Sequence, residues 1–508
     1  MNGAQFMKEI ANQKMIDNIE YLEQETKQKI NREIDHFISE VVNEVTKNES
    51  NVKQLTNIFN NNYEITDKVK VLNGRLPEKV FVCRNSLLSD LYTIKHIRTI
   101  YHIFIALFVG QCIHNAVEDY LSSGQILIGT DKIFNGLAKF DVAATLWITM
   151  FLLTLANYVF FVCWSNIRIN IFPNTLKLKM WDCVWIGSLI CYYISFFYYF
   201  TNAVFNNKFP PPTAIIVLIE SVRLTMKSYA FIRSNVPRVL NYKSHSEKEN
   251  PCPSFSKFLY FLFAPTLIYK DNYPRTRTIR WKAVFFYAIE FTSIILFISF
   301  FMNRYFLSVF QDYGKGPIPW KEVALHTLGN LPAGGAFMLC GFYILLHVWL
   351  NGFAEILTFG DRMFYKDWWN STSYGPYYRK WNVVVHDWLY TYIYKDMYEN
   401  VLPKNRFVPK LFVFFVSALV HEYILSVAFG FFFPILFLEF FVIGVTLVFL
   451  TFGGTFHGNI FLWFTIPFGA CLAINMYCIE YFVRQNCPIE NATATDFFIP
   501  RLLTCKQL

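Results

Sequence analysis

Charged residues are scarce in this sequence. They make up 16% of the 508 residues, whereas 54% are hydrophobic and 19% are aromatic. An ordinary soluble enzyme carries more charge than this, so the composition predicts a membrane protein. The net charge of +9 does not indicate a nucleic-acid partner, because the basic residues lie in segments between apolar runs and form no separate basic domain.

Paired cysteines and the Cys/His spacing of a metal site are also missing, although the chain has 11 cysteines. We therefore expect no metal and no bound cofactor. Several cysteines lie inside apolar runs, where they behave as small hydrophobes: Cys112, Cys163, Cys183, Cys191, Cys340 and Cys471. Cys487 and Cys505 differ, because they flank the polar C-terminal tail, where an oxidising lumen would let them pair.

The first 45 residues contain no basic start followed by a short apolar core, so we expect no cleavable signal peptide. Apolar residues instead recur at three- and four-residue steps over residues 14–45, among Glu, Lys and Gln. This pattern predicts an amphipathic helix in a cytosolic N-terminal region, residues 1–95. The helix would either associate with other copies or pack on the protein's own cytosolic face or on lipid.

Long apolar runs dominate residues 96–485, the expected catalytic domain. A membrane-spanning helix needs about 20 mostly apolar residues, and nine runs meet this requirement. They lie at residues 97–117, 140–164, 180–204, 212–232, 281–302, 332–350, 409–431, 433–451 and 456–483. The fourth run contains Glu220 and Arg223, which we expect to pair or to line a cavity. The sequence predicts an all-α multi-pass membrane protein with about nine transmembrane helices.

Basic residues concentrate in three connectors, at residues 166–179, 233–280 and 352–408. Because positive loops stay on the cytosolic side, all three are expected there. The N-terminus is then cytosolic, and nine spans place the tail, residues 486–508, in the lumen with Cys487 and Cys505.

The seventh run carries two ionisable side chains, His421 and Glu422, near its middle. Such groups are costly in an apolar span, so they indicate a site that faces a cavity. The alternative is a histidine that hydrogen-bonds a neighbouring helix. Burial favours the neutral imidazole, which is the form that a general base needs.

Two other catalytic arrangements are excluded or disfavoured around His421. A zinc-protease HExxH motif would require histidine where the chain has Leu425. Ser417 lies one turn before His421 on the same helical face, but no strand-to-helix elbow presents it as a nucleophile. We expect Ser417 to be a hydroxyl that faces the substrate.

A second polar pattern follows the basic connector. Asn382, His386, Tyr390 and Tyr394 recur at four-residue steps, which predicts a polar and aromatic stripe along one helix face. Such a stripe would suit a long polar ligand. An interfacial helix with its aromatic residues at the headgroup level is the alternative.

A third pattern interleaves aromatic residues with a carboxylate and an amide. It reads Phe364-Tyr365-Lys366-Asp367-Trp368-Trp369-Asn370. The two tryptophans beside Asp367 and Asn370 offer stacking surfaces and hydrogen-bond partners for a ligand with a large polar head. An aromatic belt at the membrane surface is the alternative.

These segments resemble the membrane-bound O-acyltransferase (MBOAT) superfamily, whose FYxDWWN string stands here at residues 364–370. The runs at 359–370, 377–390 and 416–423 are similar to those of the sterol O-acyltransferase family, as are those at 235–240 and 261–269. The WNVVVHDWLY run and the Cys487 and Cys505 tail favour the sterol enzymes over the sibling diacylglycerol acyltransferases. The resemblance implies the MBOAT fold, with helices around a buried reaction chamber, and a disulfide between Cys487 and Cys505.

The resemblance also assigns roles to individual residues. The family's catalytic histidine corresponds to His421, and the partner asparagine corresponds to Asn382. Contacts with acyl-CoA, a co-substrate, would come from Trp381, Arg379, His386, Tyr390, Tyr394, Ser417 and Arg406. Glu422 would hold the imidazole tautomer or contact the sterol hydroxyl.

The predicted reaction is transfer of a fatty acyl group from acyl-CoA to the 3β-hydroxyl of cholesterol or a related sterol. The product is a steryl ester for storage. The resemblance further implies an endoplasmic reticulum membrane location and a homodimer or homotetramer. Two alternatives stay open: the same chemistry on diacylglycerol or another alcohol, and a channel, transporter or sterol-binding scaffold that uses the intramembrane charges as a path.

Overall fold

The computed structural model describes residues 76–124, 126, 130–171, 175–242, 251–403, 405–450, 455–489 and 494–505, together with Leu22, Glu25, Thr26, Ser39 and Glu40. The chain divides into two compact units, Met1–Val69 and Lys70–Leu508. The five described residues of the first unit are helical and exposed. Otherwise the helix predicted at 14–45 lies outside the described residues.

Every element named in the described part of the second unit is helical. Extended pairing in that part consists of isolated bridges between Arg84 and Asp361 and between Arg275 and Phe359. The α-helices are α2 (Leu87–Leu91), α3 (Lys95–Ser123), α4 (Thr130–Gly136), α5 (Phe140–Ile169), α6 (Leu176–Asn207), α7 (Pro211–Asn241), α8 (Phe255–Phe263), α9 (Trp281–Met302), α10 (Ser308–Phe310), α11 (Trp320–Gly329), α12 (Leu331–Phe342), α13 (Leu350–Ile356), α14 (Tyr374–Trp381), α15 (Val383–Leu389), α16 (Phe407–Phe429), α17 (Ile435–Phe437), α18 (Gly444–Phe449), α19 (Thr455–Asn486) and α20 (Ala494–Phe498).

Several wide π-helical turns interrupt or extend these helices: η1 (Asn303–Leu307), η2 (Tyr343–Trp349), η4 (Tyr390–Tyr394), η5 (Met397–Val401) and η6 (Leu438–Ile443). Two short 3₁₀ turns, η3 (Trp368–Asn370) and η7 (Arg501–Leu503), complete the described elements. Turns of the π type occur often at functional sites.

Seven helical segments in the described residues are long and apolar enough to cross a membrane. They are Lys95–Ser123, Lys132–Ile169, Leu176–Asn207, Trp281–Phe310, Leu331–Ile356, Phe407–Phe429 and His457–Asn486. Each contains or largely overlaps one of the predicted runs, which confirms the multi-pass fold. The predicted count of nine is not confirmed, because the helix at Ile435–Phe449 is short and α7 carries too many charges.

The charges of α7 are paired inside the protein, as the sequence predicts. Arg223 and Glu220 form an ion pair at 2.6 Å. Lys227, only 2% exposed, donates to the carbonyl oxygens of Phe261, Leu262 and Ala264 at 2.6 to 2.9 Å. A cation at a helix C-terminus satisfies carbonyl groups that have no partner within the helix. Lys227 therefore fastens the end of α8 to α7.

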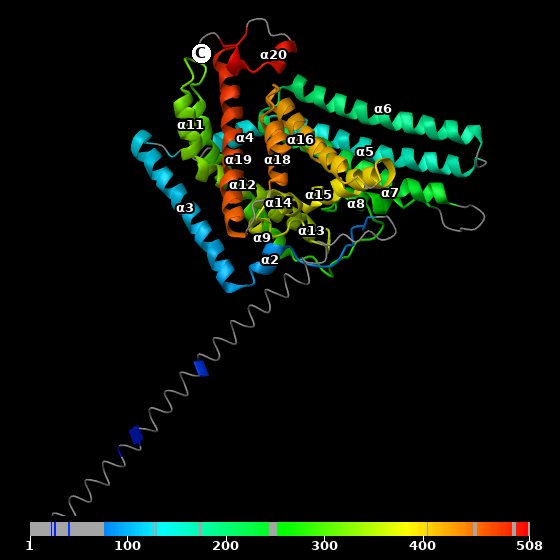
Figure 1. The fold of residues 1–508 in the computed structure, drawn as a ribbon, viewed down its shortest axis with the longest axis horizontal. Helices are drawn as coiled ribbons and strands as arrows, with labels where there is room; N and C mark the ends of the chain where they lie inside the picture. Colours follow the sequence, from blue (N-terminus) through cyan, green and yellow to red (C-terminus); the bar gives the residue numbers. More distant parts are fainter. Residues whose placement is uncertain are drawn as a thin grey trace, which may run out of the picture. The chain divides into compact units, whose positions relative to one another are not determined.

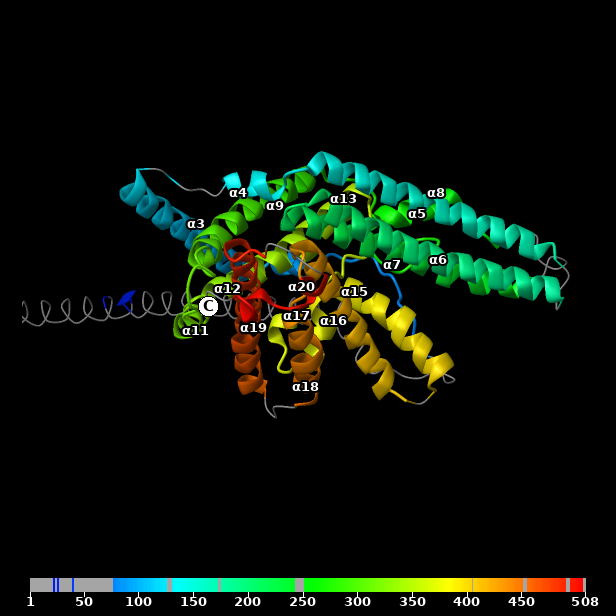
Figure 2. The same cartoon turned by 90° about the horizontal axis from the view of Figure 1, so that it is seen from above.

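Helices α5, α6 and α7 lie side by side (Figures 1 and 2) and bury a common apolar core. Val427 and Ala428 of α16 belong to the same core. A second core forms where α12 packs on α19. There a side chain at Gly334 would meet the Cβ atom of Cys471 at 2.7 Å, so the close approach of the two helices requires glycine.

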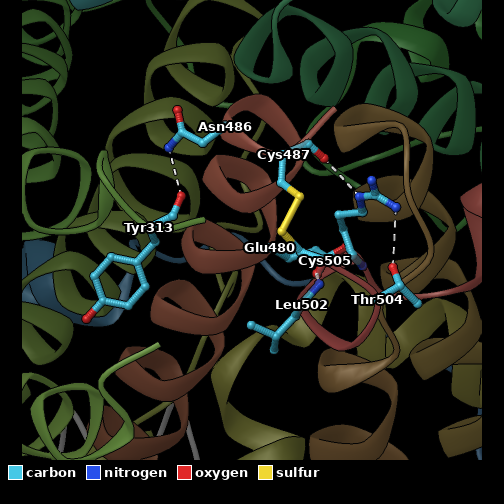
Figure 3. The surroundings of a disulfide bond; sticks show 8 residues. Tyr313, Glu480, Asn486, Cys487, Leu502, Thr504 and Cys505 are labelled. Carbon is cyan, nitrogen blue, oxygen red and sulfur yellow. Dashed lines mark hydrogen bonds between the residues drawn. A yellow bond between two sulfur atoms is a disulfide. The ribbon is translucent and has the colours of Figure 1, made fainter. Parts of the chain in front are cut away.

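The C-terminal segment folds back onto the end of α19. Figure 3 shows the disulfide between Cys487 and Cys505, which confirms the predicted pairing. The Glu480 carboxylate accepts hydrogen bonds from the backbone N–H groups of Arg501 and Leu502 at 2.6 and 2.9 Å. The Arg501 guanidinium donates to the Cys487 carbonyl at 2.9 Å. The tail is thus held by hydrogen bonds as well as by the disulfide.

Candidate active site

His421 lies near the middle of α16, and its own helix fixes one side of its ring. The Nδ1 atom lies 2.7 Å from the carbonyl oxygen of Ser417, one turn earlier. A carbonyl can only accept a hydrogen bond, so Nδ1 carries the proton in this arrangement. The neutral ring then presents Nε2 with a free lone pair. The imidazole is exposed and stacks on Phe440 of η6, with the ring centroids 4.9 Å apart.

Asn382 lies between two helices and not within one. It follows α14 with φ −132° and caps the N-terminus of α15, where its Oδ1 accepts a hydrogen bond from the Val385 N–H at 3.1 Å. The prediction of one continuous helical stripe from Asn382 to Tyr394 is therefore wrong at its first member. Asparagine favours this break because its side chain satisfies an N–H that has no partner in the helix. The cap uses Oδ1 and leaves the Nδ2 amino group as a donor.

The remaining members of the predicted stripe, His386, Tyr390 and Tyr394, do share one face, and Tyr398, which was not predicted, extends it. His386, Tyr390, Tyr394 and Tyr398 stack in succession, with neighbouring ring centroids 6.4, 5.8 and 6.2 Å apart and ring planes within 17°. We call these four rings the aromatic ladder. The ladder runs from α15 through η4 to η5, and η4 packs against α16.

A chain of aromatic contacts connects α14 with the surroundings of His421. Tyr378 of α14 lies one turn before Asn382, and its ring contacts Phe414 of α16 at 5.1 Å and Phe440 at 6.4 Å. Phe440 in turn stacks on His421. No hydrogen bond joins His421 to Asn382 within the described residues; the two share a neighbourhood through Tyr378 and Phe440.

Three cations lie around the start of α16. Arg379 and Arg406 are exposed, and Lys410 lies over the ring of Phe449 at 4.9 Å. Lys410 is within electrostatic reach of Arg379, and Arg406 is within reach of Tyr394. None of the three forms an ion pair with another described residue. Their charges are available to an anionic ligand.

The FYxDWWN motif is mostly buried. Phe364, Tyr365 and Trp368 belong to the core, and the Tyr365 hydroxyl lies 2.6 Å from Nδ1 of the buried His347. Trp368 packs against Trp381, with centroids 4.6 Å apart. These contacts indicate that the motif holds α12, α14 and η2 together.

The other motif residues make fewer buried contacts. Asp367 pairs with Lys380 of α14 at 3.1 Å. The Trp369 carbonyl accepts hydrogen bonds from Asn459 and Trp463 of α19 at 2.8 and 3.1 Å, and Asn370 is exposed. Trp381, expected beside the ligand, is partly buried in the same aromatic cluster as Trp368.

Glu422 does not hold the imidazole. Only 3% exposed, it accepts hydrogen bonds from Ser426, from the Tyr477 hydroxyl and from the Phe437 N–H, each at about 3.1 Å. Adjacent residues of a helix point in directions about 100° apart, so Glu422 faces α17 and α19 while His421 faces η6. Glu422 therefore does not hold the imidazole tautomer and instead ties three elements together. Its alternative role, a contact with the sterol hydroxyl, stays a prediction.

Glu439 is an intramembrane carboxyl that the sequence reasoning missed. It lies on η6 directly before Phe440, and its carboxyl group faces Gly469 of α19, where a Cβ atom would come within 3.8 to 3.9 Å of it. Its Oε1 atom is buried without a hydrogen-bond partner among the described residues. The signal was the same as for His421, an ionisable residue inside an apolar run.

Comparison with known proteins shows the family of this chain. Sterol O-acyltransferase 1 of Mus musculus is 37% identical over 440 residues, which is 85% of this chain and 80% of the mouse protein. Sterol O-acyltransferase 2 is 37% identical in Rattus norvegicus and 36% identical in Homo sapiens; each alignment covers 84% of this chain and at least 80% of the relative. Residues 140–483 match the membrane-bound O-acyltransferase family. The chain belongs to the sterol O-acyltransferases of this family.

The residues described above fall within the matched region of this sterol O-acyltransferase family member. His421, Asn382 and the aromatic ladder all lie between residues 140 and 483. The tail with Cys487 and Cys505 follows it directly. Membership of an acyltransferase family favours acyl transfer over the channel, transporter and scaffold alternatives.

Proposed function

We propose that the protein transfers a long-chain fatty acyl group from acyl-CoA to the 3β-hydroxyl of cholesterol or a related sterol. Family membership supports the acyl-transfer chemistry, and the names of the relatives, all sterol O-acyltransferases, favour a sterol over diacylglycerol. The observation that carries the mechanism is the hydrogen bond between His421 Nδ1 and the Ser417 carbonyl.

That hydrogen bond supports His421 as the general base. With the proton on Nδ1, Nε2 accepts the proton of the sterol hydroxyl while the hydroxyl oxygen attacks the thioester carbonyl carbon. The tetrahedral intermediate then collapses, the C–S bond breaks, and the imidazolium returns the proton to the departing CoA thiolate. The sterol oxygen keeps the acyl group, and the histidine regains its starting state.

Asn382 is proposed to donate a hydrogen bond to the thioester oxygen through Nδ2. The backbone N–H of Val385 occupies Oδ1 and fixes the orientation of the amide. A donor held in place before reaction stabilises the developing oxyanion more than a mobile one.

The acyl-CoA is proposed to lie along the aromatic ladder, with its phosphates near Arg379, Arg406 and Lys410. Arginine suits phosphate oxygens because its planar group donates two parallel hydrogen bonds. Ser417 would line the same path beside His421. The adenine and pantetheine parts of CoA would contact His386, Tyr390 and Tyr394.

The proposed location is the endoplasmic reticulum membrane, with the N-terminus in the cytosol and the tail in the lumen. The basic connectors support this orientation, and the disulfide fits an oxidising lumen. We further propose a homodimer or homotetramer tethered by the helix at 14–45. Deletion of residues 1–45 should lower the mass measured in detergent, and an unchanged mass would reject that tether.

An acceptor panel tests the proposed reaction. The purified protein is given labelled oleoyl-CoA with cholesterol, diacylglycerol or retinol, and the esters are separated and counted. We expect steryl oleate to dominate. Faster ester formation on diacylglycerol or retinol would assign the protein another acceptor.

A further inference from the structure

The short segment at residues 76–79, which we call the strap, lies along the helix that carries the aromatic ladder. The Leu76 N–H donates to Glu399 at 2.6 Å, and the Tyr390 hydroxyl donates to the Pro77 carbonyl at 3.3 Å. Lys79 pairs with Asp387 at 2.7 Å across 308 positions of sequence. The strap therefore contacts α15, η4 and η5 in turn.

Asp387 directly follows His386, the first ring of the aromatic ladder. Its Oδ1 lies 3.6 Å from Nδ1 of His386, and its Oδ2 binds Lys79. The two paired side chains are only 16% and 21% exposed. Burial raises the pKa of Asp387, but the charge of Lys79 and the contact with His386 outweigh this and hold the pKa below its usual value. Asp387 is thus ionised at neutral pH.

The charge of Asp387 reaches the ladder. Burial, the neighbouring Tyr394 and the carboxylates of Glu399 and Asp387 together raise the pKa of Tyr390 to about 12. CoA carries several negative charges on its phosphates, so an uncompensated carboxylate here would repel it. At physiological salt, the electrostatic interaction between charges is screened beyond roughly 8 to 10 Å.

Resting on the proposed acyl-CoA site, we propose that Lys79 is a positioning residue of that site. By pairing with Asp387, it cancels a carboxylate beside the aromatic ladder and keeps the ladder attractive to a polyanionic thioester. The mechanism described above does not use Lys79, which lies far from His421 in sequence and before the first span. Its effect is exerted on binding and not on the chemical step.

The test measures KM and kcat for oleoyl-CoA with the purified full chain. Lys79→Met should raise KM about fivefold at low salt, because Asp387 is left unpaired, with kcat within about twofold. The increase should shrink as salt is added. Asp387→Asn should lower KM, because it frees the Lys79 charge, and the double variant should return to the KM of the wild type.

Lys270→Met is the matched control. Lys270 also pairs with the strap, through Glu78 at 3.1 Å, but this pair is more exposed, so KM should stay within about twofold of the wild type. If Lys79→Met and Asp387→Asn both raise KM, or if the double variant does not recover, the strap only holds the fold and the inference is wrong. If Lys79→Met does not fold, the direction of the Asp387→Asn change decides alone. Failure of the wild type to form steryl ester would instead reject the proposed function.

Discussion

At the scale of single residues, the central feature is that two side chains are oriented by backbone groups of their own segments. Ser417 O holds Nδ1 of His421, and Val385 N–H holds Oδ1 of Asn382. In each case the backbone contact leaves the opposite chemical group free: a proton acceptor on His421 and a donor on Asn382. Neither residue needs a second side chain for its orientation, which is why Glu422 is free to serve the packing of α16.

Two substitutions at Asn382 test the roles of its side-chain oxygen and its amino group separately. Asn382→Asp keeps an oxygen for the cap but loses the Nδ2 donor, and Asn382→Ala loses both. We expect either change to lower kcat about 10²- to 10³-fold, while only Asn382→Ala also loses about 1 kcal/mol of stability from the cap. Steady-state kinetics and thermal unfolding in detergent measure the two effects. Near-normal kcat in Asn382→Asp would exclude the donor role.

At the scale of elements, α16 is held by a buried carboxylate on one face while His421 lies on another. Glu422 joins α16 to α17 through the Phe437 N–H and to α19 through the Tyr477 hydroxyl, and it also accepts a hydrogen bond from Ser426 of α16. Glu439, on the neighbouring η6, has an acceptor atom with no partner among the described residues. A buried polar group is tolerated when it is paired and destabilising when it is not.

These two carboxyl groups should respond in opposite directions to the same substitution. Glu422→Leu removes the acceptor of Ser426 and of the Phe437 N–H, while the Tyr477 hydroxyl keeps the Phe433 carbonyl as its other acceptor. The variant should have a lower thermal midpoint, because the free energy of unfolding falls by about 1 to 3 kcal/mol. Glu439→Leu should raise the midpoint, because it removes an unpaired buried group. Thermal unfolding of the two purified variants makes the comparison. A lower midpoint for Glu439→Leu would show that its carboxyl has a partner in the assembled protein.

The elements also show how far the sequence could predict the site. Apolar run length predicted nine spans, and seven of these runs correspond to helices long and apolar enough to cross a membrane. One of the seven is α16, which carries His421; run length works here because burial in lipid dictates composition directly. The four-residue period predicted three rings of the ladder, those of His386, Tyr390 and Tyr394, but not Tyr398. The period wrongly placed Asn382 within the helix, because the spacing of residues does not distinguish a capping residue from a helical one. In the structure the backbone leaves the helical conformation at Asn382, where ψ is 88°. The partners of the Glu422 and Glu439 side chains depend on which helices pack beside them, and the spacing of residues in the sequence does not predict that packing.

At the scale of the whole molecule, the residues of the candidate active site differ from those that hold the C-terminal tail. The disulfide and the Glu480 contacts fasten the tail to α19. Helices such as α3 and α6 leave apolar side chains exposed, including Ile103, Leu107 and Ile194. Exposed apolar surface of this extent is what lipid covers in a multi-pass protein.

Removal of the disulfide should therefore affect stability more than catalysis. Cys487→Ser opens a loop of 18 positions, for which a loss of about 2 to 4 kcal/mol is typical. The hydrogen bonds of Glu480 and Arg501 remain and keep the tail near α19. We expect ester formation within about twofold of wild type below the unfolding temperature, measured beside thermal unfolding with and without reductant. Complete loss of activity in a folded Cys487→Ser protein would mean that the tail takes part in the reaction.

The most direct test of the account is steryl ester formation by purified His421→Ala. We expect this variant to insert, fold and elute from size exclusion like the wild type, yet to form no steryl oleate from labelled oleoyl-CoA and cholesterol above the background without enzyme. A folded His421→Ala protein that forms the ester at a near-normal rate would contradict the assignment of His421 as the general base.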